Sequence, residues 1–140
     1  MRIRRAVTAG ATAAASIAAV LTFNSPAQAA MTKFCNAPFS KGGSVCFYSD
    51  GDNITVTDNW ADGLRSVAKW WVEDRDHGNR VVATGECHNA NGKGTTVTCR
   101  NDFPEGKNVV IGFYAVAREG ANGRDQYPDD HITIGWVSGR

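Results

Sequence analysis

Four cysteine residues constrain the fold of this 140-residue chain more than any other feature of its sequence. An even number of cysteines in a small chain indicates disulfide bonds when no metal-binding spacing is present. The chain has no C-x-x-C pair, and we therefore expect no metal site. The sequence predicts two disulfides, formed by Cys35, Cys46, Cys87 and Cys99.

Turn-forming residues favour one of the three pairings that four cysteines allow. The stretch between Cys35 and Cys46 includes a proline and two adjacent glycines, and the stretch between Cys87 and Cys99 includes Asn-Gly-Lys-Gly. Both stretches can turn the chain back on itself. Bonds from Cys35 to Cys46 and from Cys87 to Cys99 would each close a short loop, stabilising the fold by about 2 to 4 kcal/mol.

An alternative pairing joins Cys46 to Cys99. Trp60 lies between these two cysteines in the sequence, as the core tryptophan does in immunoglobulin domains. However, Val97 stands two positions before Cys99, where that family has the tyrosine of its corner motif. The local pairing is therefore preferred, and the alternative stays open.

The N-terminal residues have the pattern of a secretory leader. Three arginines in the first five residues precede an uncharged stretch at 6–23, and Ala27 and Ala29 are small residues of the kind that a signal peptidase recognises. We therefore expect a helical signal peptide at residues 1–29 and a single secreted, extracellular domain at residues 30–140. Retention of the leader as a membrane anchor is the alternative, which the alanine-rich apolar stretch disfavours.

Removal of the leader changes the charge of the protein. Three of the 15 Lys and Arg residues lie in the leader, whereas all 14 Asp and Glu residues lie beyond it, so the formal charge becomes −2. A mildly acidic domain of this size is neither a polybasic nucleic-acid binder nor a multidomain enzyme. No later segment approaches 18 consecutive apolar residues, and we expect no stable membrane insertion after cleavage. We also expect no cofactor, because no glycine-rich loop precedes a predicted helix.

The pattern of β-branched, aromatic and turn-forming residues predicts strands and no helix beyond the leader. Residues 108–117 are apolar on both faces, which indicates a central strand. Residues 80–87 and 95–100 are expected to form a hairpin that the second disulfide closes. The fold class is therefore all-β, an antiparallel, immunoglobulin-like β-sandwich of about seven strands with two disulfides. The expected strands lie at 44–49, 53–57, 66–73, 80–87, 95–100, 108–117 and 131–138.

Two adjacent tryptophans identify the first candidate binding residue. Successive side chains of a strand point to opposite faces, so Trp70 and Trp71 cannot both face the core. Trp71 is the candidate for the outer face, where it would offer a platform for a sugar ring or an anchor for a protein partner. The alternative is that the N-terminal disulfide loop, with Phe34 and Phe39, folds over it.

A loop at residues 119–130 is the second candidate binding surface. It is the longest segment without periodicity, and it carries Arg124, Gln126 and Tyr127 among acidic residues. Long loops on rigid sandwiches often carry function, and this composition suits adaptable recognition. The hypothesis is that binding depends on this loop together with Trp71, and the alternative is a tolerant loop without a ligand.

The densest polar cluster, at residues 73–77, is the only candidate for catalysis. Glu73 or Asp76 with His77 or His131 could supply the acid and base of a small hydrolase. No third orienting group can be placed beside them from the sequence, which favours a solvated hairpin loop instead. We assign no catalytic residue.

The layout of the chain resembles that of small secreted proteins of unknown role from actinomycetes. The resemblance rests on the alanine-rich leader, the early C-x10-C spacing and the segments VTDNWADGLRSVAKWWV and DFPEGKNVVIGFYAVA. It implies a secreted, disulfide-bonded β-sandwich. A looser similarity is to the actinomycete α-amylase inhibitors, but their Trp-Arg-Tyr binding triplet is absent here, where Trp70, Trp71 and Val72 stand instead.

These observations favour a secreted, noncatalytic binding module or inhibitor that acts on an extracellular protein or polysaccharide. A structural protein of the cell surface or matrix is the first alternative, and a small extracellular hydrolase with a carboxylate and histidine pair is the second. Because no catalytic constellation is evident, an enzyme is the less favoured interpretation.

Overall fold

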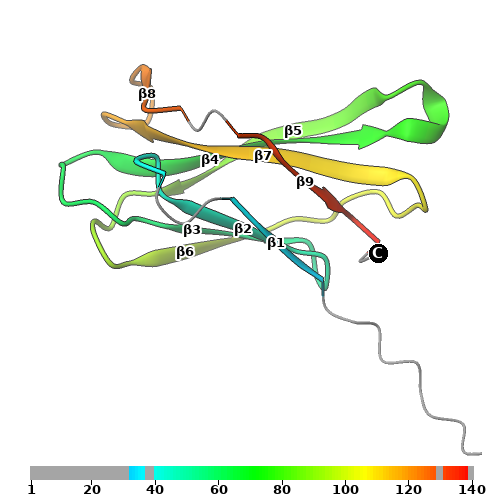
Figure 1. The fold of residues 1–140 in the computed structure, drawn as a ribbon, viewed down its shortest axis with the longest axis horizontal. Coiled ribbons are helices and arrows are strands. Elements are labelled where there is room, and N and C mark those ends of the chain that lie inside the picture. Colours follow the sequence, from blue (N-terminus) through cyan, green and yellow to red (C-terminus); the bar gives the residue numbers. More distant parts are fainter. Residues whose placement is uncertain (1–31, 37–39, 129–130, 139–140) are drawn as a thin grey trace, which may run out of the picture.

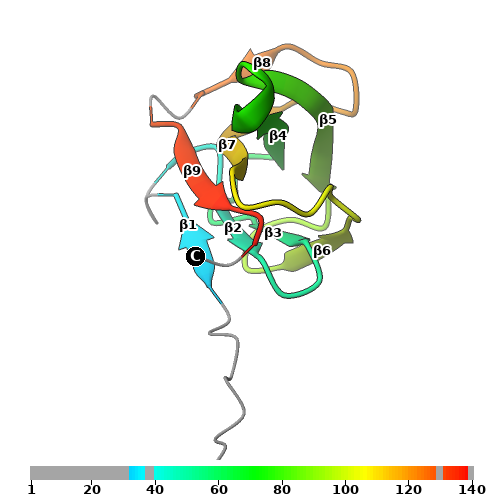
Figure 2. The ribbon, with the colours of Figure 1, turned by 90° about the vertical axis from the view of Figure 1, so that its right-hand side faces the viewer.

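The computed structural model describes residues 32–36, 40–128 and 131–138, so the expected signal peptide lies outside the described residues. The described chain is all-β, with two sheets and two disulfides. Figure 1 shows the sheets as two layers, and Figure 2 shows the same layers turned by 90°. The described residues contain one helical turn, the 3-10 helix η1 (Arg75–His77), in the connection between β4 and β5.

The first sheet has four antiparallel strands in the order β1-β2-β3-β6. Their bounds are Lys33–Cys35 for β1, Ser44–Tyr48 for β2, Asn53–Thr57 for β3 and Thr96–Arg100 for β6. The expected hairpin between β2 and β3 is confirmed. Its turn places Gly51 and Asp52 at positive φ, a backbone region that glycine and aspartate tolerate better than other residues do.

The second sheet has five strands and curls into a half-barrel. Its order is β5-β4-β7-β8, and β9 also pairs with β7. The bounds are Arg65–Asp74 for β4, Arg80–Asn89 for β5, Val109–Arg118 for β7, Asp125–Gln126 for β8 and Thr133–Trp136 for β9. The prediction of a central strand near 108–117 is confirmed, because β7 pairs with β4 on one side and with β8 and β9 on the other.

The hydrophobic core lies between the two sheets, where alternate residues of each strand face inward. The fully buried side chains include Val45, Phe47, Ile54 and Val56 of the first sheet and Val72, Ile111 and Phe113 of the second. Phe103, from the connection between β6 and β7, fills the space beside Trp70, with ring centroids 5.0 Å apart.

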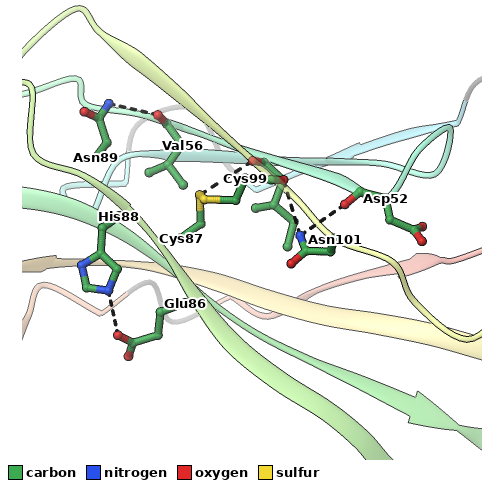
Figure 3. The surroundings of a disulfide bond; sticks show 9 residues. Asp52, Val56, Glu86, Cys87, His88, Asn89, Cys99 and Asn101 are labelled. Carbon is green, nitrogen blue, oxygen red and sulfur yellow. Dashed lines mark hydrogen bonds and ion pairs between the residues drawn. A yellow bond between two sulfur atoms is a disulfide. The ribbon is translucent and has the colours of Figure 1, made fainter.

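Both preferred disulfides are confirmed, and the alternative bond from Cys46 to Cys99 is not formed. Cys35 and Cys46 are directly opposite each other on β1 and β2, within the first sheet. The bond between Cys87 and Cys99 joins β5 to β6, and these strands belong to different sheets. Figure 3 shows this bond, with the neighbouring Asn89 donating a hydrogen bond to the carbonyl of Val56.

The expected hairpin of residues 80–87 and 95–100 is wrong. β5 pairs with β4 through nine residues, and β6 pairs with β3 through five. The physical reason is the tight connection at Gly78 and Asn79, both at positive φ, which folds β5 back onto β4 and satisfies its backbone. The chain then crosses to the other sheet before β6 begins, and the disulfide bridges that crossing.

Sequence patterns missed two short strands, and the structure excludes the core position that the disfavoured disulfide pairing implied for Trp60. β1 and β8 are three and two residues long, too short for a recognisable alternation. Trp60, which the alternative disulfide would have placed in an immunoglobulin-type core, is 42% exposed. The immunoglobulin-like arrangement stays a prediction, because the second sheet is curled rather than a flat sandwich layer.

Candidate functional site

Trp70 and Trp71 point to opposite faces of β4, as their adjacency predicts. Trp70 is half-buried and packs against the core between the sheets. Trp71 lies on the outer face of the second sheet and is also half-buried. Phe34 does not cover Trp71, because its ring stacks on Phe47 and lies against Gly135. Phe39, the other residue of the expected cover, lies outside the described residues.

The indole of Trp71 lies against the backbone of Gly112 on the neighbouring strand β7. A Cβ atom at Gly112 would overlap the six-membered ring of Trp71, so only glycine leaves room for the indole there. The ring nitrogen Nε1 donates a 2.8 Å hydrogen bond to Oε1 of Glu73, which fixes the other side of the ring. Tyr114 lies two residues after Gly112 on the same face of β7. The centre of its ring is 6.3 Å from that of Trp71, and the planes of the two rings are at 60°.

A pocket of about 270 Å³ lies beside these two rings on the outer face of the second sheet. Lys69, Thr84 and Glu86 line it together with Trp71 and Tyr114. We call this the Trp71 groove. It combines a flat aromatic wall with a hydroxyl, a carboxylate and an ammonium group, a mixture that can orient a polar ligand.

Exposed apolar residues extend this face toward β9. Ile134 is directly opposite Gly112 on β9, so it lies in the same cross-strand row as Trp71. It is 42% exposed, and Ile132, just before β9, is 57% exposed. Exposed aliphatic side chains next to an aromatic groove are a common feature of ligand-binding surfaces.

A network of four charged side chains borders the groove. Arg118 on β7 donates two hydrogen bonds, of 2.8 and 2.9 Å, to the two carboxylate oxygens of Glu86 on β5. Its Nε donates a 2.9 Å hydrogen bond to Asp125 on β8. Lys69 on β4 donates to the other oxygen of Asp125 at 2.7 Å. The network therefore links all four strands of the order β5-β4-β7-β8.

The charges within the network shift one another's pKa. Hydrogen bonds from Arg118 hold the pKa of Glu86 below its ordinary value, and the bonds to Glu86 and Asp125 raise the pKa of Arg118. Partial burial would raise the pKa of Asp125, but the bonds from Lys69 and Arg118 outweigh it and the pKa is lowered. The bond to Asp125 raises the pKa of Lys69. All four groups are therefore charged at neutral pH.

The network also explains the burial of residues on the outer face. Val67 and Val116 are opposite each other on this face, yet both are fully buried. The side chain of Arg118 reaches from β7, opposite Arg65, across β4 to Glu86 on β5, opposite Lys69, and Val67 lies midway between those two positions on β4. The outermost of four flat strands would be about 14 Å apart. One guanidinium can therefore bind Glu86 on β5 and Asp125 on β8 only if the sheet curls toward this face.

The predicted binding residues of the 119–130 loop lie in three different settings. Gln126 is half-buried in β8 and pairs with Ala117. Arg124 is exposed in the connection before β8. Tyr127 is 49% exposed and lines a pocket with Trp60 rather than with Trp71. Of this loop it is Asp125, which the sequence did not single out, that reaches the residues bordering the groove.

The predicted acid and base cluster is an exposed turn. His77 lies 2.6 Å from Asp74, and this contact lowers the pKa of Asp74. Glu73 accepts the hydrogen bond from Trp71, and Asp76 accepts one from the amide of Asn108. The carboxylates of the cluster thus have separate partners, and they do not converge on one reacting position.

The residues that the structure describes offer neither a metal site nor a membrane-crossing helix. Among them, no three His, Cys, Asp or Glu side chains are grouped so that they could hold a metal ion. In the same residues, no helix has the length and apolar character that a membrane crossing requires.

Comparison with known proteins adds no relative. No protein-family model matches the chain, and comparisons with curated proteins and with solved structures find no match either. The candidate sites therefore rest on the geometry of this chain alone.

Sequence reasoning missed most of the groove, although one signal was present. A glycine inside an apolar strand indicates that a large group approaches the backbone, and Gly112 is such a residue. Glu86, Arg118 and Asp125 carried no comparable signal, because the residues that they pair with are 7 to 56 positions away in the chain.

Proposed function

We propose that this chain is a secreted, noncatalytic binding domain and that its ligand is a polysaccharide lying in the Trp71 groove. The leader-like N-terminus and the two disulfides support an extracellular location. The separate partners of the carboxylates in the 73–77 cluster support a noncatalytic role.

The single observation that carries the proposal is the seating of Trp71. Its indole rests on Gly112 and is tied to Glu73, so its orientation is set before any ligand arrives. A fixed ring loses little conformational entropy on binding, which favours affinity. The carbon-bound hydrogens of a sugar ring pack well on such a flat, electron-rich surface.

The polar lining of the groove favours a sugar over a purely apolar ligand. The hydroxyl of Thr84 can donate or accept, Glu86 accepts and Lys69 donates. A polyhydroxylated chain offers both donors and acceptors to such a set. A pocket of about 270 Å³ is also small, which suits one or two sugar rings.

A protein ligand, with the chain acting as an inhibitor, is the second candidate. The exposure of Ile132 and Ile134 beside the groove favours it, because apolar side chains at the centre of an interface anchor protein partners. A protein would cover both isoleucines, whereas a sugar chain in the groove would depend on Trp71 and Tyr114.

The test is binding of the disulfide-bonded protein, without residues 1–29, to a panel of insoluble, uncharged polysaccharides. We expect retention of wild type and loss of at least about tenfold in affinity for Trp71→Ala, with intact polysaccharide recovered at the end. Val81→Ala is the control, because it removes an exposed apolar side chain of the same sheet that does not line the groove. Equal retention of Trp71→Ala and wild type, or no retention of wild type, would overturn the proposal.

A further inference from the structure

Two further pockets lie at one end of the two-layered fold. Four connections meet there: β1 to β2, β3 to β4, β5 to β6 and β7 to β8. Figure 1 shows these connections at the left-hand end of the molecule. The larger pocket, of about 310 Å³, is lined by residues from 58–65, by 90–93 and by Gly120. The smaller one, of about 240 Å³, is lined by Lys41, residues 60–62 and Tyr127. Neither pocket shares a lining residue with the Trp71 groove.

Trp60 stands between the two pockets and lines both. Its Nε1 donates a 3.2 Å hydrogen bond to the carbonyl of Ser40, and its backbone N–H donates a 3.0 Å bond to Asp58. The first bond holds the ring and the second holds the backbone, while 42% of the residue stays exposed. A large aromatic ring that is fixed and uncovered is a typical anchor for a ligand.

The floor of the larger pocket is rigid. The backbone of Asp58 exchanges hydrogen bonds with the 90–95 connection, donating to Thr95 and accepting from Gly94. Asn89 is fully buried and bonds the same connection through Thr95 and Asn91. A buried polar residue with its bonds satisfied keeps a loop in one conformation.

One carboxylate oxygen of Asp58 lacks a hydrogen-bond donor among the described residues. The residue is 2% exposed, and its Oδ1 accepts the bond from Trp60. Its Oδ2 is buried and has no hydrogen-bond partner in the described part of the chain. A buried carboxylate oxygen without a donor is costly, so a group that donates an O–H or N–H here would be stabilising.

The guanidinium group of Arg65 lacks an acidic partner among the described residues. It lines the same pocket, and it is directly opposite Arg118 on β7. Glu86 and Asp125 are bonded to Arg118, and Asp58, which lines the same pocket as Arg65, forms no ion pair with it in the described part of the chain. Nε of Arg65 is buried, and among the described residues it has no partner. Two like charges that are directly opposite on adjacent strands repel each other. An anion bound at Arg65, which lacks a partner, would relieve that repulsion.

The positions of further lysines favour a ligand that carries a negative group at regular intervals. Lys93 lines the larger pocket beside Arg65, and Lys41 lines the smaller one, where it lies 4.8 Å from the ring centre of Tyr127. Asp62 is the acid of the smaller pocket, and it caps its own loop by accepting from the N–H of Leu64. Each pocket therefore offers at least one cation on its own side of Trp60.

We propose that these two pockets bind an oligosaccharide whose rings carry carboxylates, with Trp60 between adjacent rings. One uronate carboxylate pairs with Arg65 and Lys93, and a hydroxyl of the same ring donates to Asp58. The next carboxylate pairs with Lys41. A phosphate group fits less well, because it offers no ring to Trp60 and its charge of about −1.5 to −2 brings more repulsion to Asp58 than a single carboxylate does.

The test is calorimetric titration of the disulfide-bonded protein with a trimer of galacturonic acid and with a neutral glucose trimer of equal length. We expect binding of the acidic trimer, at least tenfold weaker binding of the neutral one, and weakening with added salt. Arg65→Gln and Trp60→Ala should each weaken the acidic trimer by about tenfold or more.

Two controls and one further variant make the result decisive. Lys107→Ala removes an exposed cation away from the pockets and should change nothing, whereas Lys93→Gln should weaken binding even if Arg65→Gln fails to fold. The titrations are repeated in the Trp71→Ala background, where the Trp71 groove does not contribute, so this proposal and that for the groove fail independently. Equal binding of the neutral trimer, no binding, or preference for a short peptide with a free C-terminal carboxylate would overturn the proposal.

Discussion

The indole of Trp71 on β4 lies against the backbone of Gly112, its directly opposite residue on β7, on the outer face of the second sheet. The same relationship recurs on the inner face, where Trp70 lies against Gly85 of β5. Each tryptophan of the adjacent pair therefore has a glycine directly across the ladder. The two glycines leave space for two large rings on a sheet that would otherwise be crowded.

Gly112→Ala should displace Trp71 from the sheet, because the added methyl overlaps the indole. We expect ligand binding in the groove to weaken about tenfold, with a loss of stability of about 1 kcal/mol. Gly85→Ala is the matched variant, and it should cost more stability because the ring of Trp70 packs against the core. Urea unfolding and polysaccharide retention, measured on both variants, check this. Unchanged retention by Gly112→Ala would count against a role for the seated ring.

Arg118→Ala should destabilise the fold by about 3 kcal/mol. The change leaves the carboxylates of Glu86 and Asp125 without their main partner and uncovers Val67. Arg80→Ala, which removes an exposed cation at the start of β5, should cost less than about 0.5 kcal/mol. Guanidinium chloride unfolding measures both values. Similar stabilities for the two variants would show that the network contributes little.

The stability of the protein should fall in acid because of the same network. The pKa values of Glu86 and Asp125 are lowered in the folded state from the ordinary values of 4.5 and 3.8. Carboxylates of this kind stabilise the fold above their unfolded pKa, and the contribution is lost as the pH falls through the folded pKa. We therefore expect the urea midpoint to drop below about pH 4.5. The double variant Glu86→Gln, Asp125→Asn should show a weaker dependence, and an identical pH profile would contradict the assignment.

The two disulfides should differ in their contribution to stability. They close loops of similar length, with sequence separations of 11 and 12, so loop entropy alone predicts about 3 kcal/mol for each. Cys87 is fully buried between the sheets, whereas Cys35 is exposed. Replacing Cys87 and Cys99 by alanine should therefore cost about 1 kcal/mol more than replacing Cys35 and Cys46. Unfolding midpoints under non-reducing conditions test this, and equal costs would leave loop entropy as the whole explanation.

The candidate sites could be predicted from the sequence only in part. Trp71 was found because a period of two forces adjacent residues of a strand apart. Tyr127 was found because it lies in a long loop, but its neighbour Trp60 was not, since a lone tryptophan between two cysteines also fits a core position. Arg65 gave no signal of its own, because its unpaired charge depends on which residues Arg118 binds.

The sequence by itself determined the local features of this protein. The hairpin at Asp52 and the opposite orientations of the two adjacent tryptophans depend on short-range geometry. Turn-forming residues favoured the pairing of Cys35 with Cys46 and of Cys87 with Cys99 but did not exclude a bond from Cys46 to Cys99. Only the tertiary structure decided that β5 joins β4 while β6 joins β3, that Arg118 ties Glu86 to Asp125, and that Trp60 is exposed. The reason is that alternation along a strand specifies its faces but not its neighbour, and strand partners are chosen by contacts between distant segments.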